Sequence, residues 1–141
     1  MEKSKKVVIA THGKLAEGFV SALEIIVGDM SHVEVICGYT TPDFNLDESI
    51  LNIVKNHDFK TQELIVCTDM MGGSINNGFV RYLSQYPFHL ITNINLAFLV
   101  DLLLTSEAMS KEVLTSKVDE EMVSVKYINN LVDSFNDSDD L

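Results

Sequence analysis

The sequence is poor in positive charge and in long apolar runs, and both shortages narrow what the protein can do. Ten Lys and Arg residues stand against 21 Asp and Glu residues, which gives a net charge of −11. Nucleic acids are bound by clustered Lys and Arg, and here these residues are scattered, so we expect no nucleic-acid partner. No apolar run approaches the roughly 20 residues that cross a bilayer, and no signal-peptide core follows the N-terminus. We therefore expect a cytoplasmic protein.

Cysteine and the common phosphate-binding motifs are also scarce or missing. The two cysteines, Cys37 and Cys67, lack a second cysteine at the spacing of a zinc site or a redox motif, and both lie in apolar runs. This favours buried thiols in a reducing compartment. Neither G-x-x-x-x-G-K-[ST] nor G-x-G-x-x-G occurs, so direct nucleotide binding is not indicated. We expect no metal site and no cofactor.

The 141 residues, 46% of them hydrophobic, match a single globular domain. Short β-rich runs alternate with segments of helical periodicity. The runs predict strands over 6–10, 33–37, 64–68, 89–92 and 123–128, and helices over about 15–27, 46–54, 76–86, 96–105 and 107–119. Such alternation with short connections predicts an α/β fold, a doubly wound, mostly parallel sheet with helices on both faces. We assign 1–131 to the domain and 132–141 to an acidic C-terminal tail that we expect to be frayed and solvated.

Two loops that follow predicted strands carry the residues of chemical interest. If the first and third strands are neighbours, their carboxyl ends meet at the switch point of the sheet, where open α/β folds bind ligands. Asp69 would then lie near His12, where a carboxylate on one ring nitrogen fixes the tautomer and leaves the other lone pair free. A Gly-Gly turn before a helix can point backbone N–H groups at an anion. The two loops supply Thr11, His12, Gly13, Asp69, Gly72, Gly73 and Ser74.

These residues resemble the enzyme IIA domains of the mannose class (mannose/fructose/sorbose) of the bacterial phosphoenolpyruvate-dependent sugar phosphotransferase system. The similarity runs from Val7 to about Leu131. Its most specific parts are Thr11-His12-Gly13 with Ala16-Glu17, and Asp69 followed by Gly72-Gly73-Ser74. The loop Asn93-Ile94-Asn95-Leu96 also looks like the family's loop after the fourth strand.

The resemblance implies a phosphocarrier. His12 would take a phosphoryl group from the histidine-containing phosphocarrier protein and pass it to a histidine of a IIB domain. Asp69 would orient His12, and Thr11, Gly13, Gly72, Gly73 and Ser74 would hold the phosphoryl group. The membrane IIC and IID components would be indirect partners. Two positions differ from the family: Ile75 and Asn95 stand where prolines are usual, which we expect to loosen both loops.

Three other interpretations remain open. The phosphodonor subunit of dihydroxyacetone kinase has a similar first domain. A receiver domain shares the layout but needs an acidic pair after its first strand, and Ala10-Thr11-His12-Gly13 has none. A non-catalytic module that binds phosphate or flavin mononucleotide is the third, although the first loop is not rich in Ser and Thr.

The resemblance also implies an oligomer. Members of this family are typically homodimers in which a C-terminal strand crosses to the partner's sheet. The segment 123–128 looks similar, so we expect a homodimer with this strand exchanged.

Overall fold

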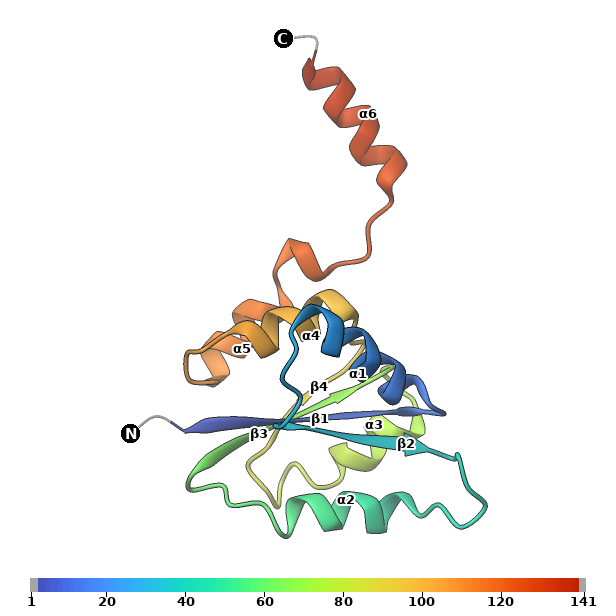
Figure 1. Cartoon of the computed structure of the whole chain (residues 1–141), viewed down its shortest axis with the longest axis vertical. Helices are drawn as coiled ribbons and strands as arrows, with labels where there is room; N and C mark the ends of the chain where they lie inside the picture. Colours follow the sequence, from blue (N-terminus) through green and yellow to red (C-terminus); the bar gives the residue numbers. More distant parts are fainter. Residues whose placement is uncertain (1–2, 140–141) are drawn as a thin grey trace.

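The computed structural model describes residues 3–139, and its centre is a four-stranded parallel sheet (Figure 1). The strands are β1 (Ser4–His12), β2 (Val33–Gly38), β3 (Gln62–Thr68) and β4 (His89–Ile91). Their order is β2-β1-β3-β4, with every neighbouring pair parallel. The predicted α/β fold is therefore confirmed, and β1 and β3 are neighbours as the site prediction required.

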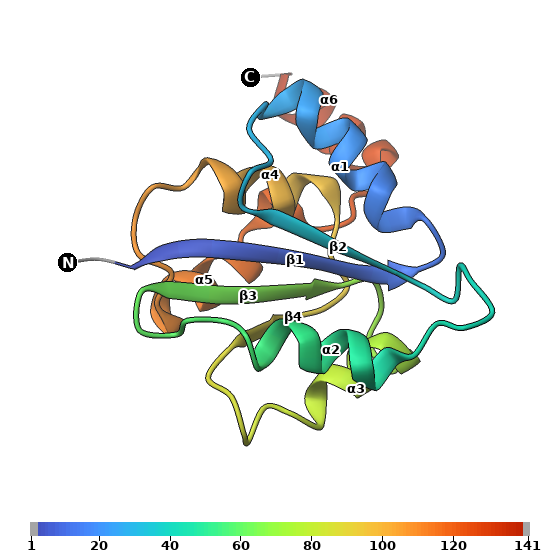
Figure 2. The ribbon, with the colours of Figure 1, turned by 60° about the horizontal axis from the view of Figure 1, so that its bottom comes forward.

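Helices cover both faces of the sheet, as Figures 1 and 2 show. On one face lie α1 (Leu15–Ile26), α4 (Leu96–Leu104) and α5 (Lys111–Val118), and on the other lie α2 (Leu46–Val54) and α3 (Ser74–Val80). Successive strand side chains point to opposite faces, which gives two cores. Val7 and Ile9 pack with α1, α4 and α5, whereas Val8 and Ala10 pack with α2 and α3.

Several local features follow from the residues that form them. Asn45 caps α2, because its side-chain oxygen accepts a hydrogen bond from the Glu48 N–H at 3.0 Å. Gly28 follows α1 with φ of +102°, a conformation that suits glycine after a helix. Cys67 is fully buried, and burial raises the pKa of its thiol to about 12. Cys37 is only half-buried.

Two helix predictions need correction. The helix predicted over 76–86 is α3, which begins earlier, at Ser74, and ends at Val80. Residues 81–86 form turns. Phe79 and Leu83, which are spaced as on one helix face, therefore lie in α3 and in the turns after it. The helix predicted over about 107–119 is α5, which begins only at Lys111 and ends at Val118.

The strand predicted over 123–128 is wrong for the single chain. A 3-10 helix (η1, Glu121–Val123) is followed by extended chain and then by α6 (Ile128–Asp139). Strands need a hydrogen-bonded neighbour, and the described residues place none beside this segment, where Val125 is 96% exposed. Exchange of this segment into a partner's sheet therefore stays a prediction.

The tail is helical rather than frayed over its described part. α6 extends away from the sheet and its covering helices, as Figure 1 shows in orange and red. Ile128, Leu131 and Val132 recur at helical spacing, a pattern hidden by the many acidic residues around them. All three side chains are exposed. Asp140 and Leu141, also assigned to the tail, lie outside the described residues.

Ile75 and Asn95, the two positions where the family usually has proline, both make contacts that hold the fold. Ile75, the second residue of α3, is fully buried in the core between the sheet and helices α2 and α3. Asn95 caps α4, because its side-chain oxygen accepts from the Phe98 N–H at 2.8 Å. The Asn95 amide also donates to the Val123 carbonyl. Asn95 thus connects the start of α4 to the segment that leads into α6.

Replacing Asn95 should separate these two roles. Asn95→Ala loses the cap and the tie to Val123, so the free energy of unfolding should fall by about 1 to 2 kcal/mol. Asn95→Asp keeps an oxygen for the Phe98 N–H but has no donor for the Val123 carbonyl, so it should lose less stability than Asn95→Ala but not none. Urea unfolding of both variants measures the effect, and equal losses for Ala and Asp would contradict the capping role.

Candidate functional site

The site lies at the carboxyl ends of β1 and β3, and His12 is its centre. His12 is the last residue of β1, and its register partner on β2 is Gly38. The middle of the strand, from Val7 to Thr11, is completely buried, whereas the His12 side chain is 41% exposed. The imidazole is therefore held by a rigid central strand and still reaches solvent.

Asp69 forms hydrogen bonds with both the backbone and the ring of His12. One carboxylate oxygen, Oδ2, accepts the His12 backbone N–H at 2.9 Å and lies 3.0 Å from the ring nitrogen Nδ1. The other oxygen accepts the N–H of Met70 at 3.0 Å. The Asp69 side chain is only 12% exposed, and this burial acts to raise its pKa, but the hydrogen bonds from His12 outweigh burial and lower it. Asp69 is therefore an ionised carboxylate.

The charge of Asp69 decides the tautomer of His12. An ionised carboxylate only accepts hydrogen bonds, so Nδ1 must carry the proton that it shares with Oδ2. The second ring nitrogen, Nε2, then keeps its lone pair while the ring is neutral. The ring is thus oriented by Asp69 with the lone pair of Nε2 free, the geometry that a nitrogen nucleophile requires.

Ser74 and the Gly-Gly turn lie beside the free nitrogen. The Ser74 hydroxyl is 3.4 Å from Nε2, too long for a strong hydrogen bond. A Cβ at Gly73 would lie 3.1 Å from the ring atom Cε1 of His12, so any larger residue here would crowd the ring. Gly72 has φ of +79°. The structure therefore brings Asp69, Gly73 and Ser74 together with His12.

Thr11 and Gly13 are near His12 in the chain, but their polar groups are engaged elsewhere. Thr11 is completely buried, and its hydroxyl accepts the N–H of Ala16 at 2.8 Å, which fixes the start of α1. Gly13 has φ of +58° and donates its N–H to the Gly38 carbonyl at 2.8 Å. The geometry thus gives both residues a part in shaping the loop.

Two further residues complete the site: Tyr39, which the sequence did not point to, and Asn93, which the sequence placed only in a family-like loop. Tyr39, directly after β2, places its hydroxyl 2.8 Å from the Ser74 hydroxyl and its ring 5.8 Å from that of His12. Asn93, after β4, accepts the Met71 N–H at 2.8 Å and so holds the loop after β3. Both have positive φ, of +63° and +58°. Their position at the carboxyl end of a strand was the available signal.

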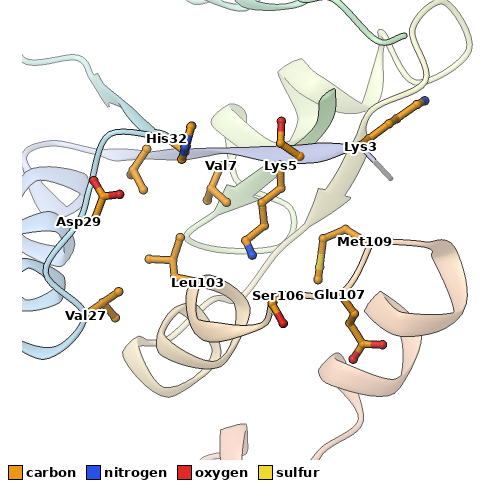
Figure 3. A pocket seen from close by; sticks show the side chains of 12 residues that line it. Lys3, Lys5, Val7, Val27, Asp29, His32, Leu103, Ser106, Glu107 and Met109 are labelled. Atoms are coloured by element: carbon orange, nitrogen blue, oxygen red, sulfur yellow. The ribbon is translucent and has the colours of Figure 1, made fainter. Parts of the chain in front are cut away.

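The His12 side chain lies at a solvent-exposed edge of the sheet. A cavity of about 300 Å³ shown in Figure 3 lies at the opposite edge, among the amino ends of β1 and β2, and shares no residue with it. In that cavity Lys5 donates to the Thr105 carbonyl, and burial, with a smaller effect of Lys117, lowers the pKa of Lys5. This cavity is therefore separate from the candidate site around His12.

Comparison with known families agrees with this chemistry. Residues 6–119 match the model of the EIIA-man family, the fructose IIA component of the phosphotransferase system. The chain belongs to this family. It is thus a IIA component of the mannose/fructose class, whose members take part in phosphoryl transfer during sugar uptake. The comparison with curated proteins gave no match.

Solved structures include similar IIA folds. A protein of Klebsiella pneumoniae, described as a phosphoenolpyruvate-dependent sugar phosphotransferase permease, is 30% identical with a TM-score of 0.85 over 94% of this chain and 96% of its own. The IIA protein of a Streptococcus pneumoniae fucose operon is 24% identical, with a TM-score of 0.76 and coverage of 93% and 98%. The mannose/sorbose IIA subunit of Enterococcus faecalis is 17% identical, with a TM-score of 0.75 and coverage of 88% and 94%.

The lowered pKa of Asp69 gives this IIA chain a specific pH dependence. Folding favours the carboxylate, so its contribution to stability is complete above the ordinary pKa of 3.8 and is lost as pH falls through the lowered value. Asp69→Asn should lower the free energy of unfolding by roughly 1 kcal/mol near neutral pH and by progressively less in acid.

Urea unfolding of both proteins between neutral pH and the acid range measures this difference. Asp43→Asn, which removes the same charge from an exposed loop residue, is the matched control. A difference between parent and Asp69→Asn that stays constant into the acid range would contradict the assignment.

Proposed function

We propose that His12 accepts a phosphoryl group from the histidine-containing phosphocarrier protein and passes it to a histidine of a IIB domain, in the cytoplasm. The observation that carries the proposal is the hydrogen bond between Asp69 and Nδ1. It leaves the lone pair of Nε2 free on a ring that reaches solvent. Family membership supports phosphoryl transfer as the chemistry. Phosphoryl transfer itself needs in-line positioning and charge stabilisation more than covalent help.

The proposed step balances at His12. The Nε2 lone pair forms the new N–P bond while the bond from phosphorus to the donor nitrogen breaks, and the donor imidazole leaves with that electron pair. The His12 ring becomes a phosphorylated imidazolium that still carries its Nδ1 proton. The Asp69 carboxylate, 3.0 Å from Nδ1, offsets this positive charge. Transfer to the IIB histidine is the same step with His12 as the donor.

The phosphoryl oxygens need donors, and the surroundings of Nε2 contain candidates. The Ser74 hydroxyl lies 3.4 Å from Nε2. Gly73 is the N-cap of α3 and no side chain caps this helix, which leaves its first N–H groups for an outside acceptor. We assign phosphoryl binding to Ser74 with Gly72 and Gly73. Thr11 and Gly13 support His12 through the shape of its loop.

Methionines beside the site suit two successive protein partners. Met70 and Met71 follow Asp69 and are 54% and 72% exposed. Exposed thioether side chains are flexible and repack easily against different surfaces. We propose that they contact both the phosphocarrier protein and the IIB domain. The sugar itself would be bound by the membrane components and would not touch this chain.

Phosphorylation of purified protein tests the proposal. The parent, incubated with phosphoenolpyruvate, enzyme I and the phosphocarrier protein, should gain one phosphoryl group that survives base and is lost in acid. His12→Ala should gain none. The measurement is intact mass.

A matched control comes from a second histidine paired with a carboxylate. His89 Nε2 lies 3.0 Å from Glu63 at the amino ends of β3 and β4, far from the site edge of the sheet. His89→Ala should be phosphorylated like the parent. A folded parent that stays unmodified, or a phosphoryl group that His12→Ala retains, would overturn the proposal.

We also propose that the chain is a homodimer in which 123–128 pairs with the partner's sheet. The exposure of Val125, Tyr127 and Ile128 in the single chain supports this. Sedimentation at micromolar concentration should give twice the 15.7 kDa mass of one chain. Val125→Asp should shift the protein towards monomer without unfolding it. A monomeric parent would contradict the dimer.

A further inference from the structure

Tyr39 is linked to His12 through one intervening hydroxyl. Its own hydroxyl lies 2.8 Å from the Ser74 hydroxyl, which lies 3.4 Å from His12 Nε2. Tyr39 directly follows β2, Ser74 begins α3 after β3, and His12 ends β1. We propose that Tyr39 is a positioning residue for phosphoryl transfer, acting through Ser74. This deepens the proposed function and rests on it.

Contacts on both sides of Tyr39 hold its backbone and its ring in place, although the residue is 54% exposed. Gly38 before it accepts the Gly13 N–H at 2.8 Å, and Thr40 after it donates its hydroxyl to the Cys37 carbonyl at 3.0 Å. The Tyr39 ring packs edge-on against Phe44, with centroids 5.1 Å apart. Tyr39 itself has a φ of +63°, which bulky residues rarely adopt and which these contacts maintain.

The direction of the hydrogen bond matters for what Ser74 can do. A phenolic hydroxyl is a better donor than an aliphatic one, so we assign the shared hydrogen to Tyr39. Ser74 then keeps its own hydrogen for Nε2 or for a phosphoryl oxygen bound there. The hydrogen bond to Tyr39 keeps Ser74 Oγ 3.4 Å from Nε2, too far to form a strong hydrogen bond with the Nε2 lone pair.

The consequence is a hydroxyl that is ready for the phosphoryl group without masking the nucleophile. A free serine hydroxyl rotates among three staggered positions, and only some of them face Nε2. Tyr39 selects one of these before the donor arrives. Such preorganisation accelerates a transfer that depends on position and on stabilised charge.

Tyr39→Phe removes the hydroxyl and keeps the ring against Phe44 and His12. Single-turnover transfer from the phosphorylated histidine-containing phosphocarrier protein should slow by roughly 3- to 10-fold, the range expected for one neutral hydrogen bond. Ser74→Ala should slow it at least as much. The double variant Tyr39→Phe with Ser74→Ala should be no slower than Ser74→Ala alone, because Tyr39 acts only through Ser74.

Nitrogen NMR of the unphosphorylated protein gives a second readout that a merely structural role would not move. The Nε2 chemical shift of His12 should change in both Tyr39→Phe and Ser74→Ala, while the ring of His89 stays unchanged as an internal reference. Thermal unfolding of each variant checks that the fold is retained.

The outcomes separate this inference from the proposed function. A phosphorylated parent with Tyr39→Phe equal to it in rate and in Nε2 shift overturns the role of Tyr39 and leaves the phosphocarrier standing. Multiplied effects in the double variant also overturn it, because Tyr39 would then act independently of Ser74. A parent that takes no phosphoryl group overturns the proposed function, and the positioning role of Tyr39 in phosphoryl transfer falls with it. The Nε2 chemical shifts would then report only whether Tyr39 contacts Ser74 beside His12.

Discussion

The structure of the site depends on one carboxylate that joins two strands. Asp69 follows β3, and it accepts both the backbone N–H and the ring Nδ1–H of His12 at the end of β1. Through these bonds a single side chain sets the position of the strand end, the orientation of the ring and its tautomer. Without Asp69 the imidazole would be free to rotate, and either nitrogen could carry the proton.

The fold is what makes this contact possible. Parallel pairing puts the carboxyl ends of β2, β1 and β3 side by side, so loops distant in sequence meet around His12. Buried strand interiors hold the frame, while the ring remains 41% exposed at its edge. A protein partner can therefore reach Nε2 directly, which suits a IIA component that receives and delivers a group on its surface.

Much of this was predictable from the sequence, because strand periodicity and motif spacing are local signals. The four strands follow from those signals. The pairing of Asp69 with His12 was predicted on the condition that β1 and β3 are neighbours, and the strand order meets that condition. Tyr39 was missed, because its role comes from a side-chain contact with Ser74 across 35 positions. The strand prediction for 123–128 was wrong because alternating apolar residues form a strand only beside a neighbouring strand, and residues 3–139 place none there.

The most direct test of the account is which ring nitrogen carries the phosphoryl group. Phosphorus and nitrogen NMR of the phosphorylated protein can distinguish Nε2 from Nδ1 of His12 through the one-bond coupling between the two nuclei. Because Asp69 holds the proton of Nδ1 in a hydrogen bond, we expect phosphorylation at Nε2 alone. A phosphoryl group on Nδ1, or on the Asp69 carboxylate, would contradict the central claim that Asp69 orients His12 as the carrier.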